Sequence, residues 1–234
     1  MPVYSRDVGA ETSWSVEATT RMNRMYRRQR HIYDGTRRYY LLGRDRLIAD
    51  LRPAAGATVL EIGCGTGRNL VHAARLYPEA RFFGIDVSTE MLTSAISAIS
   101  RRGLASRIRV THGDATTFDP RPLFGTPSFD HVMISYSLSM IPDWRHSLRV
   151  AAGRLKPGGS LHIVDFGDQE RWPELTRMLL KRWLAIFDVT PRDELERELS
   201  AIADAAGADL TFERPFGGYA QYGVLKLPQG FPKP

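Results

Sequence analysis

The chain has 234 residues, of which 43% are hydrophobic, and a chain of this size can bury one sizeable core. Its net charge is +6, but residues 21–46 hold nine arginines against two acids (9 − 2 = +7), which leaves about −1 for the remainder. A nucleic-acid-binding protein more often spreads its positive charge over the fold, so we expect no nucleic-acid partner. The single Cys64 excludes a disulfide framework, and the six histidines lack zinc-site spacing, so we expect no metal.

Residues 1–20 are polar and without periodicity, which predicts a loose N-terminal tail. They also lack the apolar core of a secretion signal, and no later run is long enough to span a membrane, so we expect a cytoplasmic protein. The arginines and tyrosines that follow are compatible with four roles: a nucleic-acid arm, a membrane-surface anchor, a lid over an active site, or a solvated helix.

Residues 21–54 carry a helical pattern. Apolar and aromatic side chains recur at the spacing of one helical face, at Met22, Met25, Tyr26, Ile32 and Tyr33. Gly35 interrupts this helix, and a second helix is expected to run through Tyr39, Leu42 and Ile48. We therefore predict a pair of basic and aromatic N-terminal helices that form a lid, in front of a domain that spans residues 55–234.

From residue 55 onward, short apolar runs alternate with helical patterns. Strands are predicted at 58–62, 81–86, 107–112, 131–135 and 160–166, with helices at 67–77, 89–101, 143–155, 173–187 and 191–206. Residues 209–227 predict two further strands joined through a Gly-Gly pair. This alternation predicts an α/β fold, a Rossmann-like, mostly parallel sheet of seven strands with helices on both faces. The helix at 173–187 is both basic and apolar, which is compatible with contact with a membrane, but we favour burial against the sheet.

A glycine loop, Gly63-Cys64-Gly65-Thr66-Gly67, follows the first of these strands. Glycines let the backbone approach a ligand closely, and the helix that follows offers free N–H groups. Arg68 stands where a dinucleotide fingerprint has its third glycine, and no Walker lysine follows, which excludes both of those motifs. Glu61 precedes the loop; its carboxylate would repel a pyrophosphate but suits a ligand with a free ammonium group. At the end of the next strand, Asp86 can accept hydrogen bonds from both hydroxyls of a ribose.

The pattern E-x-G-x-G-x-G from Glu61 to Gly67 resembles the class I, seven-stranded S-adenosylmethionine-dependent methyltransferases, and the likeness covers about residues 55–227. The resemblance implies that Asp86 holds the ribose and that Val87 and Met91 pack on the adenine, although Met91 is equally compatible with plain helix core. It also implies that Asp114 accepts from the adenine amine and Ala115 offers its N–H, with a solvated turn as the alternative for Asp114. The cofactor-binding residues implied are Glu61, Gly63, Cys64, Gly65, Gly67, Asp86, Val87, Met91, Gly113, Asp114, Ala115 and Ser135.

The loop after the fourth strand reads Ser135-Tyr136-Ser137-Leu138. It lacks the N-P-P-Y or D-P-P-Y sequence of methyltransferases that act on nucleic-acid bases, which argues against a base as acceptor. The clustered acids of a metal-assisted catechol mechanism are missing as well.

Residues 31–48, HIYDGTRRYYLLGRDRLI, resemble the front helices of the betaine-lipid N-methyltransferases, which convert diacylglycerylhomoserine to its trimethylated lipid. They resemble more loosely the phosphatidylethanolamine N-methyltransferases and the quinone C-methyltransferases, and they depart from the expected pattern at Gly35. The resemblance implies sequential N-methylation of a lipid at a membrane surface, with an aminocarboxypropyl transferase as a possible upstream partner. An inactive cofactor-binding subunit is the non-enzymatic alternative, and the presence of both Glu61 and Asp86 argues against it.

The tyrosines suit such an acceptor because an aromatic face attracts an ammonium group whether it carries N–H or N–CH3. Tyr33 and Tyr40 are the main candidates, and Tyr136 is a further one from the loop. For proton removal the candidates are Asp165, Tyr136 and direct loss to water. Substrate contacts are assigned to Arg37, Arg38 and Tyr39. Arg37 or Arg38 could bind the homoserine carboxylate, because a forked guanidinium fits it. The remaining arginines would attract anionic headgroups, which predicts peripheral association with the inner face of the membrane.

Overall fold

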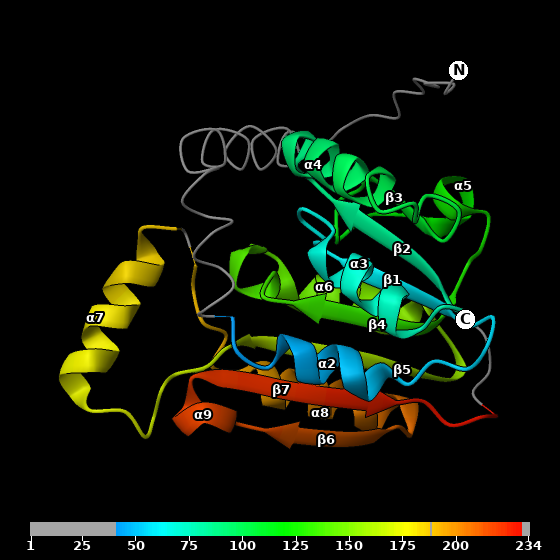
Figure 1. The fold of residues 1–234 in the computed structure, drawn as a ribbon. Helices are drawn as coiled ribbons and strands as arrows, with labels where there is room; N and C mark the ends of the chain where they lie inside the picture. The colour runs from blue at the N-terminus through cyan, green and yellow to red at the C-terminus, as the bar shows by residue number, and fades with distance from the viewer. Residues whose placement is uncertain (1–40, 188, 231–234) are drawn as a thin grey trace.

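The computed structural model describes residues 41–187 and 189–230. Their strands form one seven-stranded sheet in the order β3-β2-β1-β4-β5-β7-β6 (Figure 1). The strands are β1 (Thr58–Ile62), β2 (Arg81–Asp86), β3 (Ile108–His112), β4 (Phe129–Ser135), β5 (Leu155–Phe166), β6 (Asp209–Glu213) and β7 (Ala220–Lys226). The first five are parallel, and β7 runs antiparallel between β5 and β6. The predicted α/β fold is confirmed.

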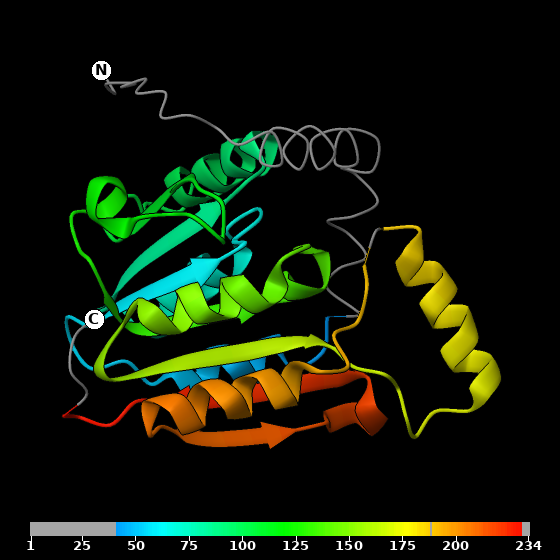
Figure 2. The same ribbon diagram turned by 180° about the vertical axis from the view of Figure 1, so that it is seen from behind.

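Helices cover both faces of this sheet, as Figures 1 and 2 show from opposite sides. One face carries α2 (Arg44–Leu51), α3 (Arg68–Leu76) and α4 (Thr89–Ser100); the other carries α5 (Pro120–Phe124), α6 (Trp144–Gly153) and α8 (Leu195–Ala206). Successive strand residues point to opposite faces. Val59 therefore belongs to the first apolar cluster and Leu60 to the second. Burial on both faces explains why these strands read as unbroken apolar runs.

Local sequence signals set the start of several helices. Ser88 is the N-cap of α4, and its side chain accepts a hydrogen bond from the backbone N–H of Met91. Asp143 caps α6 in the same way through the N–H of His146. Gly67 precedes α3 in the left-handed conformation, with φ of 71°, where a residue without a Cβ is favoured.

The helix expected through Leu42 and Ile48 begins later than predicted. Gly43 has φ of 85°, so the chain cannot be helical there, and α2 starts at Arg44. The helix is part of the domain body: Leu47, Ile48 and Leu51 are buried in the cluster that α3 and α4 also line. Tyr39 lies outside the described residues.

The fifth strand, predicted at 160–166, begins earlier, because residues 155–159 form the first part of β5. Leu155 pairs with Phe129, and an irregularity in the register separates this pair from His131 and Ser160. The sequence does not predict the short helices α5, η1 (Leu138–Met140) and α9 (Pro215–Gly218), since three to five residues give no helical period to recognise.

The helix α7 (Glu174–Ala185) stands at the edge of the sheet rather than flat against it (Figures 1 and 2). Within the helix only Leu184 is buried, whereas Leu175, Met178 and Leu179 are exposed. The expectation that this helix is buried against the sheet is therefore wrong for one of its two apolar faces.

Candidate cofactor and acceptor site

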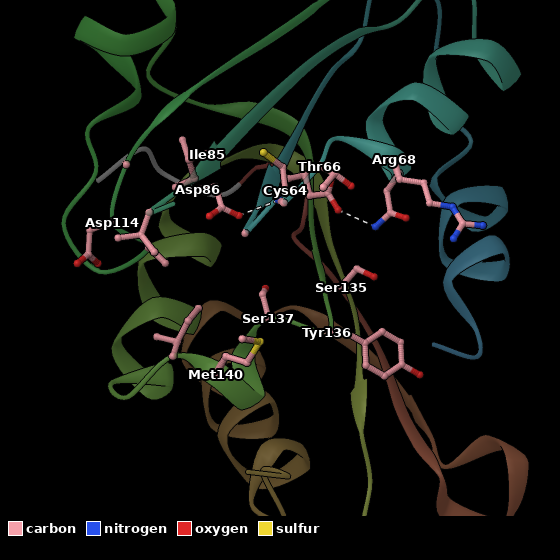
Figure 3. Close-up of a pocket in the computed structure, with 18 of the residues that line it drawn as sticks. Cys64, Thr66, Arg68, Ile85, Asp86, Asp114, Ser135, Tyr136, Ser137 and Met140 are labelled. Atoms are coloured by element: carbon pink, nitrogen blue, oxygen red, sulfur yellow. Dashed lines mark hydrogen bonds between the residues drawn. The ribbon is translucent and has the colours of Figure 1, made fainter. Parts of the chain in front are cut away.

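A pocket opens at the carboxyl ends of β1, β2 and β4, where ligands bind in open α/β sheets (Figure 3). The glycine loop and the tips of β1 and β2 form one side, and the loop after β4 forms the other. Most of the residues assigned from the sequence to cofactor binding line it: Glu61, Gly63, Cys64, Gly65, Asp86, Val87, Gly113, Asp114, Ala115 and Ser135.

The glycine loop is folded tightly against the tip of β2. The N–H groups of Gly63 and Cys64 both donate to the carbonyl of Ile85, at 2.9 and 3.0 Å. A Cβ placed on Gly63 would lie 2.6 Å from the Cβ of Ser137, whose hydroxyl donates to the carbonyl of Ile62 at 3.0 Å. A side chain at position 63 would therefore collide with the opposite wall, and Gly keeps the cradle open.

Asp86 is fixed at the tip of β2 with its carboxylate in the pocket wall. One oxygen accepts from the N–H of Gly65 at 2.7 Å and the other from the N–H of Ser88 at 2.9 Å. Each carboxylate oxygen has a second lone pair, so these bonds orient the group without exhausting its capacity to accept from a diol. This is the position and the chemistry that ribose binding requires.

Glu61 is a buried carboxylate of the pocket whose hydrogen bonds are incomplete. Its side chain is buried, and one oxygen accepts from the amide of Asn69 at 2.7 Å. The other oxygen is buried without a hydrogen-bond partner among the described residues. Burial raises the pKa of Glu61 to about 8, although the bond from Asn69 favours the charged form. A buried, half-satisfied carboxyl is costly for a fold and is explained by a cationic ligand group such as an ammonium.

On the adenine side, Gly113 is joined to β2 by its N–H, which donates to the carbonyl of Asp86 at 3.1 Å. The Asp114 carboxylate accepts from the backbone N–H and the hydroxyl of Thr116, at 2.8 and 2.6 Å. It therefore forms a turn of its own while it lines the pocket. Met91 does not line the pocket; it is buried on α4, which favours the helix-core interpretation.

Tyr136 ties the loop after β4 to the front of the domain. Its backbone is left-handed, with φ of 55°, and its hydroxyl donates to the carbonyl of Leu42 at 2.6 Å. Its ring packs edge-on against Phe166, with ring centroids 4.6 Å apart. Burial raises the pKa of this phenol well above its ordinary value of 10, and the hydroxyl is already used, so the structure places Tyr136 as a wall rather than as a proton acceptor.

Asp165 does not line the pocket. Its buried carboxylate accepts from the N–H of Ser139 at 3.1 Å and from the N–H of Phe166 at 2.7 Å. Burial raises the pKa of Asp165 to about 6. The bond to Ser139 helps to hold the loop at 138–141. The geometry therefore favours a positioning role for Asp165 over proton removal from an acceptor.

Three residues that sequence reasoning did not single out contribute to the site. Arg44, whose side chain is largely buried, lines the pocket, and its charge favours the ionised form of Glu61. Asn69 holds Glu61 from the first turn of α3. Arg192 donates to the carbonyls of Leu138 and Ile141 at 3.1 and 2.8 Å and so holds the loop that carries the opposite wall. Arg44 was one arginine among nine, and no spacing links Arg192 to the glycine loop; Asn69 stands two residues after Gly67, so its position beside the loop could have been noticed.

The remaining acceptor candidates, Tyr33, Arg37, Arg38, Tyr39 and Tyr40, lie outside the described residues. Within residues 41–187 and 189–230, no group of three or more His, Cys, Asp or Glu side chains is arranged to hold a metal ion. In the same part of the chain, no helix combines the length and the apolar character needed to cross a bilayer.

Residues 59–159 match the family model described as a methyltransferase domain. This stretch is therefore similar to a methyltransferase domain. The strands β2, β3 and β4, the glycine loop and Asp86 at the tip of β2 all lie within it.

Curated relatives of this domain act on different acceptors. The chain is 31% identical over 151 residues to the O-methyltransferase cnsE of Penicillium expansum, covering 64% of this chain and 52% of that protein. It is 32% identical over 116 residues to a demethylmenaquinone methyltransferase of Listeria monocytogenes, covering 49% and 47%. The chain thus spans about half the length of the curated relatives that it matches.

Solved structures share the fold at lower sequence identity. An O-methyltransferase family protein from Burkholderia thailandensis aligns with a TM-score of 0.68 at 20% identity, over 91% of this chain and 64% of that one. The phosphoethanolamine N-methyltransferase 2 of Haemonchus contortus, in complex with S-adenosylmethionine, aligns with a TM-score of 0.63 at 19% identity, over 80% and 52%. These likenesses concern the fold alone.

Proposed function

We propose that the protein transfers methyl groups from S-adenosylmethionine to the amine of diacylglycerylhomoserine, in sequential steps that lead to the trimethylated betaine lipid. The observation that carries the cofactor assignment is the buried carboxyl of Glu61, which presents an oxygen without a partner beside a glycine cradle. The acceptor assignment is supported by the sequence of residues 31–48 and by the apolar wall that faces the cradle.

The pocket residues fit this cofactor group by group. Glu61 would receive the ammonium of its methionine part, Asp86 the ribose hydroxyls, and Val87, Asp114 and Ala115 the adenine. Bound there, the cofactor supplies an electrophilic methyl group on a sulfonium sulfur. The protein contributes position: an in-line displacement depends mainly on holding the two reacting atoms in contact and in line.

The wall opposite the cradle suits an amphiphilic acceptor. It is formed by Leu41, Met140, Ile141, Pro142 and the ring of Tyr136. Among the described residues, the carboxylates that line the pocket are Glu61, Asp86 and Asp114, and each has a place in the cofactor assignment. The acceptor amine would therefore lose its proton to water, or to a group outside the described residues. Tyr33, Tyr40, Arg37, Arg38 and Tyr39 stay predictions for contacts with the amine and the carboxylate of the lipid.

A quinone precursor is the second candidate acceptor. Similarity to demethylmenaquinone methyltransferases favours it, and the same apolar wall would accommodate a prenylated ring. Docking on the inner face of an anionic membrane, and supply of the lipid by an aminocarboxypropyl transferase, belong to the first proposal and not to this one.

The full chain should be supplied with S-adenosylmethionine carrying a deuterated methyl group, and with diacylglycerylhomoserine, phosphatidylethanolamine or demethylmenaquinone in mixed micelles. Mass spectrometry of the extracted lipids then identifies the products. We expect diacylglycerylhomoserine to gain successive labelled methyl groups and Glu61→Gln to abolish them, while Asp204→Asn, which changes an exposed acid on α8, leaves them intact. Methylation of demethylmenaquinone alone would replace the first candidate by the second.

A further inference from the structure

The helix α7 has two apolar faces, and only one of them is covered. Leu180, Trp183, Leu184 and Phe187 pack against the core cluster of the domain. On the other side, Leu175, Met178, Leu179 and Ile186 are between 46% and 67% exposed. Four of the seven exposed large apolar residues in the described part of the chain thus lie on this helix or, for Ile186, at its C-cap. At 1.5 Å per residue, the twelve-residue helix presents a stripe about 18 Å long.

Cations accompany this stripe. The helix carries Arg177, Lys181 and Arg182 against the single acid Glu174, a balance of 3 − 1 = +2. Helical spacing places Arg182 between Leu175 and Ile186 on the exposed stripe and Lys181 at its margin. Long basic side chains of this kind extend their charged ends to a polar layer while their stems lie on apolar surface.

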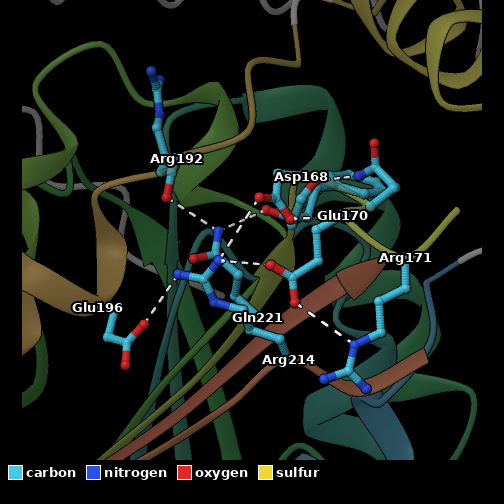
Figure 4. Close-up of polar contacts among 10 residues, drawn as sticks. Asp168, Glu170, Arg171, Arg192, Glu196, Arg214 and Gln221 are labelled. Carbon is cyan, nitrogen blue, oxygen red and sulfur yellow. Dashed lines mark hydrogen bonds and ion pairs between the residues drawn. The ribbon is translucent and has the colours of Figure 1, made fainter. Parts of the chain in front are cut away.

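The N-terminal end of α7 is fixed to the body of the domain. The loop before it is held by Trp172, whose ring N–H donates to the carbonyl of Phe216 at 3.0 Å and whose ring stacks on Tyr219. Arg214 adds ion pairs to Asp168, Glu170 and Glu196, at 3.7, 3.7 and 3.0 Å (Figure 4). The helix that carries the stripe is therefore anchored to the domain at its N-terminal end.

The residues that follow the C-terminal end of α7 contact the loop at 138–141, which lines the pocket. The N–H of Thr190 donates to the carbonyl of Ser139 at 2.9 Å, and Arg192 holds the carbonyls of Leu138 and Ile141. Ile141 and its neighbours line the pocket. Both ribbon views show α7 at the edge of the sheet where β4 and β5 end, which is the edge at which the pocket opens.

We infer that the exposed stripe of α7, formed by Leu175, Met178, Leu179, Arg182 and Ile186, docks the protein on an anionic membrane with the pocket mouth toward the lipid. Apolar side chains flanked by Lys and Arg are the composition of helices that lie in the plane of a bilayer surface. A second copy of the chain fits less well, because two +2 helices would face each other and charged residues are depleted at the centre of protein interfaces. The inference rests on the proposed function for the choice of a lipid surface, but binding can be measured without any methyl transfer.

Co-sedimentation tests it, using phosphatidylcholine vesicles with and without phosphatidylglycerol, in the absence of acceptor lipid and cofactor. We expect the full chain to bind the anionic vesicles and the interaction to weaken as salt is raised. The triple variant Leu175→Ser, Leu179→Ser, Ile186→Ser and the double variant Lys181→Glu, Arg182→Glu should each lower the partition coefficient by roughly tenfold or more.

Matched controls change the same kinds of side chain elsewhere. Leu76→Ser with Ile96→Ser removes exposed apolar residues from α3 and α4, and Arg121→Glu reverses an exposed charge on α5. These variants should bind vesicles like the unchanged protein. All the variants should bind S-adenosylmethionine equally in calorimetry, so a loss of docking is distinguishable from a loss of the proposed activity.

Two results would overturn the inference. One is that the unchanged chain does not bind the vesicles, or that the α7 variants bind them equally strongly. The other is concentration-dependent dimerisation, seen by analytical ultracentrifugation, that the α7 triple variant abolishes; the stripe would then be covered by a second copy.

Discussion

The Glu61 carboxyl lies at the bottom of the pocket with one oxygen bonded to Asn69, and burial raises its pKa to about 8 from an ordinary value of 4.5. The folded state therefore holds this proton more tightly than the unfolded chain between those two values. It follows that the contribution of Glu61 to stability falls as the pH rises from 4.5 to 8.

Glu61→Gln removes this ionisation, so we expect the variant to be more stable than the unchanged chain at pH 8, by roughly 1–3 kcal/mol. Near pH 4.5 the two should differ little. Urea unfolding at both pH values measures the difference in the free energy of unfolding. A variant that is less stable at pH 8 would show that the buried carboxylate is satisfied in a way that the structure does not show.

Gly63 offers a steric test of the cradle. Gly63→Ala would bring a Cβ within 2.6 Å of Ser137, whereas Gly103→Ala, at a similarly left-handed position with φ of 66°, meets nothing within 4 Å. Both variants carry the left-handed penalty of roughly 1–2 kcal/mol, and only the first adds an overpacking cost of about 1–3 kcal/mol. We expect Gly63→Ala alone to lose affinity for S-adenosylmethionine in calorimetry. Equal affinities in the two variants would contradict the packing of the loop.

At the scale of elements, the loop at 138–141 is held by the side chain of Arg192, a residue that follows α7 in the chain. Arg192→Ala removes the donors to Leu138 and Ile141, so we expect a loss of about 1–2 kcal/mol in the free energy of unfolding, faster proteolysis of this loop and a higher KM for the acceptor. Arg197→Ala, which changes an exposed arginine on α8, is the control and should alter none of these. Unchanged proteolysis and KM in Arg192→Ala would show that the loop holds itself in place.

Elements could be predicted where local sequence decides them. The parallel strands β1, β2, β4 and the second half of β5 are buried on both faces and therefore read as apolar runs, and Ser88 gives a cap signal. The start of α2 was missed because the left-handed backbone of Gly43 depends on its packing beside Val164 and Phe216, far away in the sequence. The exposed face of α7 was missed because an apolar pattern does not tell which of two apolar faces the rest of the chain covers.

The same distinction applies to the site. Glu61 and Asp86 could be assigned because their roles follow from their distance to the glycine loop. Arg44 and Arg192 could not, since each acts through a contact made across the fold, whereas Asn69 lies eight residues from Glu61 and was missed although it stands next to the loop. For Asp165, the tip of a strand is a suitable place for a catalytic acid, but its carboxylate accepts from the backbone N–H groups of Ser139 and Phe166, so the structure favours a positioning role and the catalytic role stays a prediction.

For the whole molecule, the pocket proposed for the cofactor is lined by the described residues, and the predicted amine-binding tyrosines Tyr33 and Tyr40 precede them in the sequence. Removal of residues 1–40 should therefore leave the affinity for S-adenosylmethionine within a fewfold of that of the full chain while abolishing methyl transfer to lipid. Calorimetry and lipid mass spectrometry measure the two properties separately. The cut spares α2, whose Arg46 pairs with Glu213 and whose apolar face is buried. A truncated chain that still methylates lipid would remove the tyrosines and arginines of this segment from the proposal.

Calorimetric titration of the full chain with S-adenosylmethionine at pH 7, in two buffers of different ionisation enthalpy, tests the central assignment most directly. With its pKa at about 8, most of the Glu61 carboxyl is protonated at that pH, so binding of an ammonium group should release close to one proton. We predict that Glu61→Gln binds at least roughly tenfold more weakly and releases no proton, whereas Asp204→Asn behaves like the unchanged chain. Absence of binding, or equal affinity and proton release in Glu61→Gln, would contradict the account.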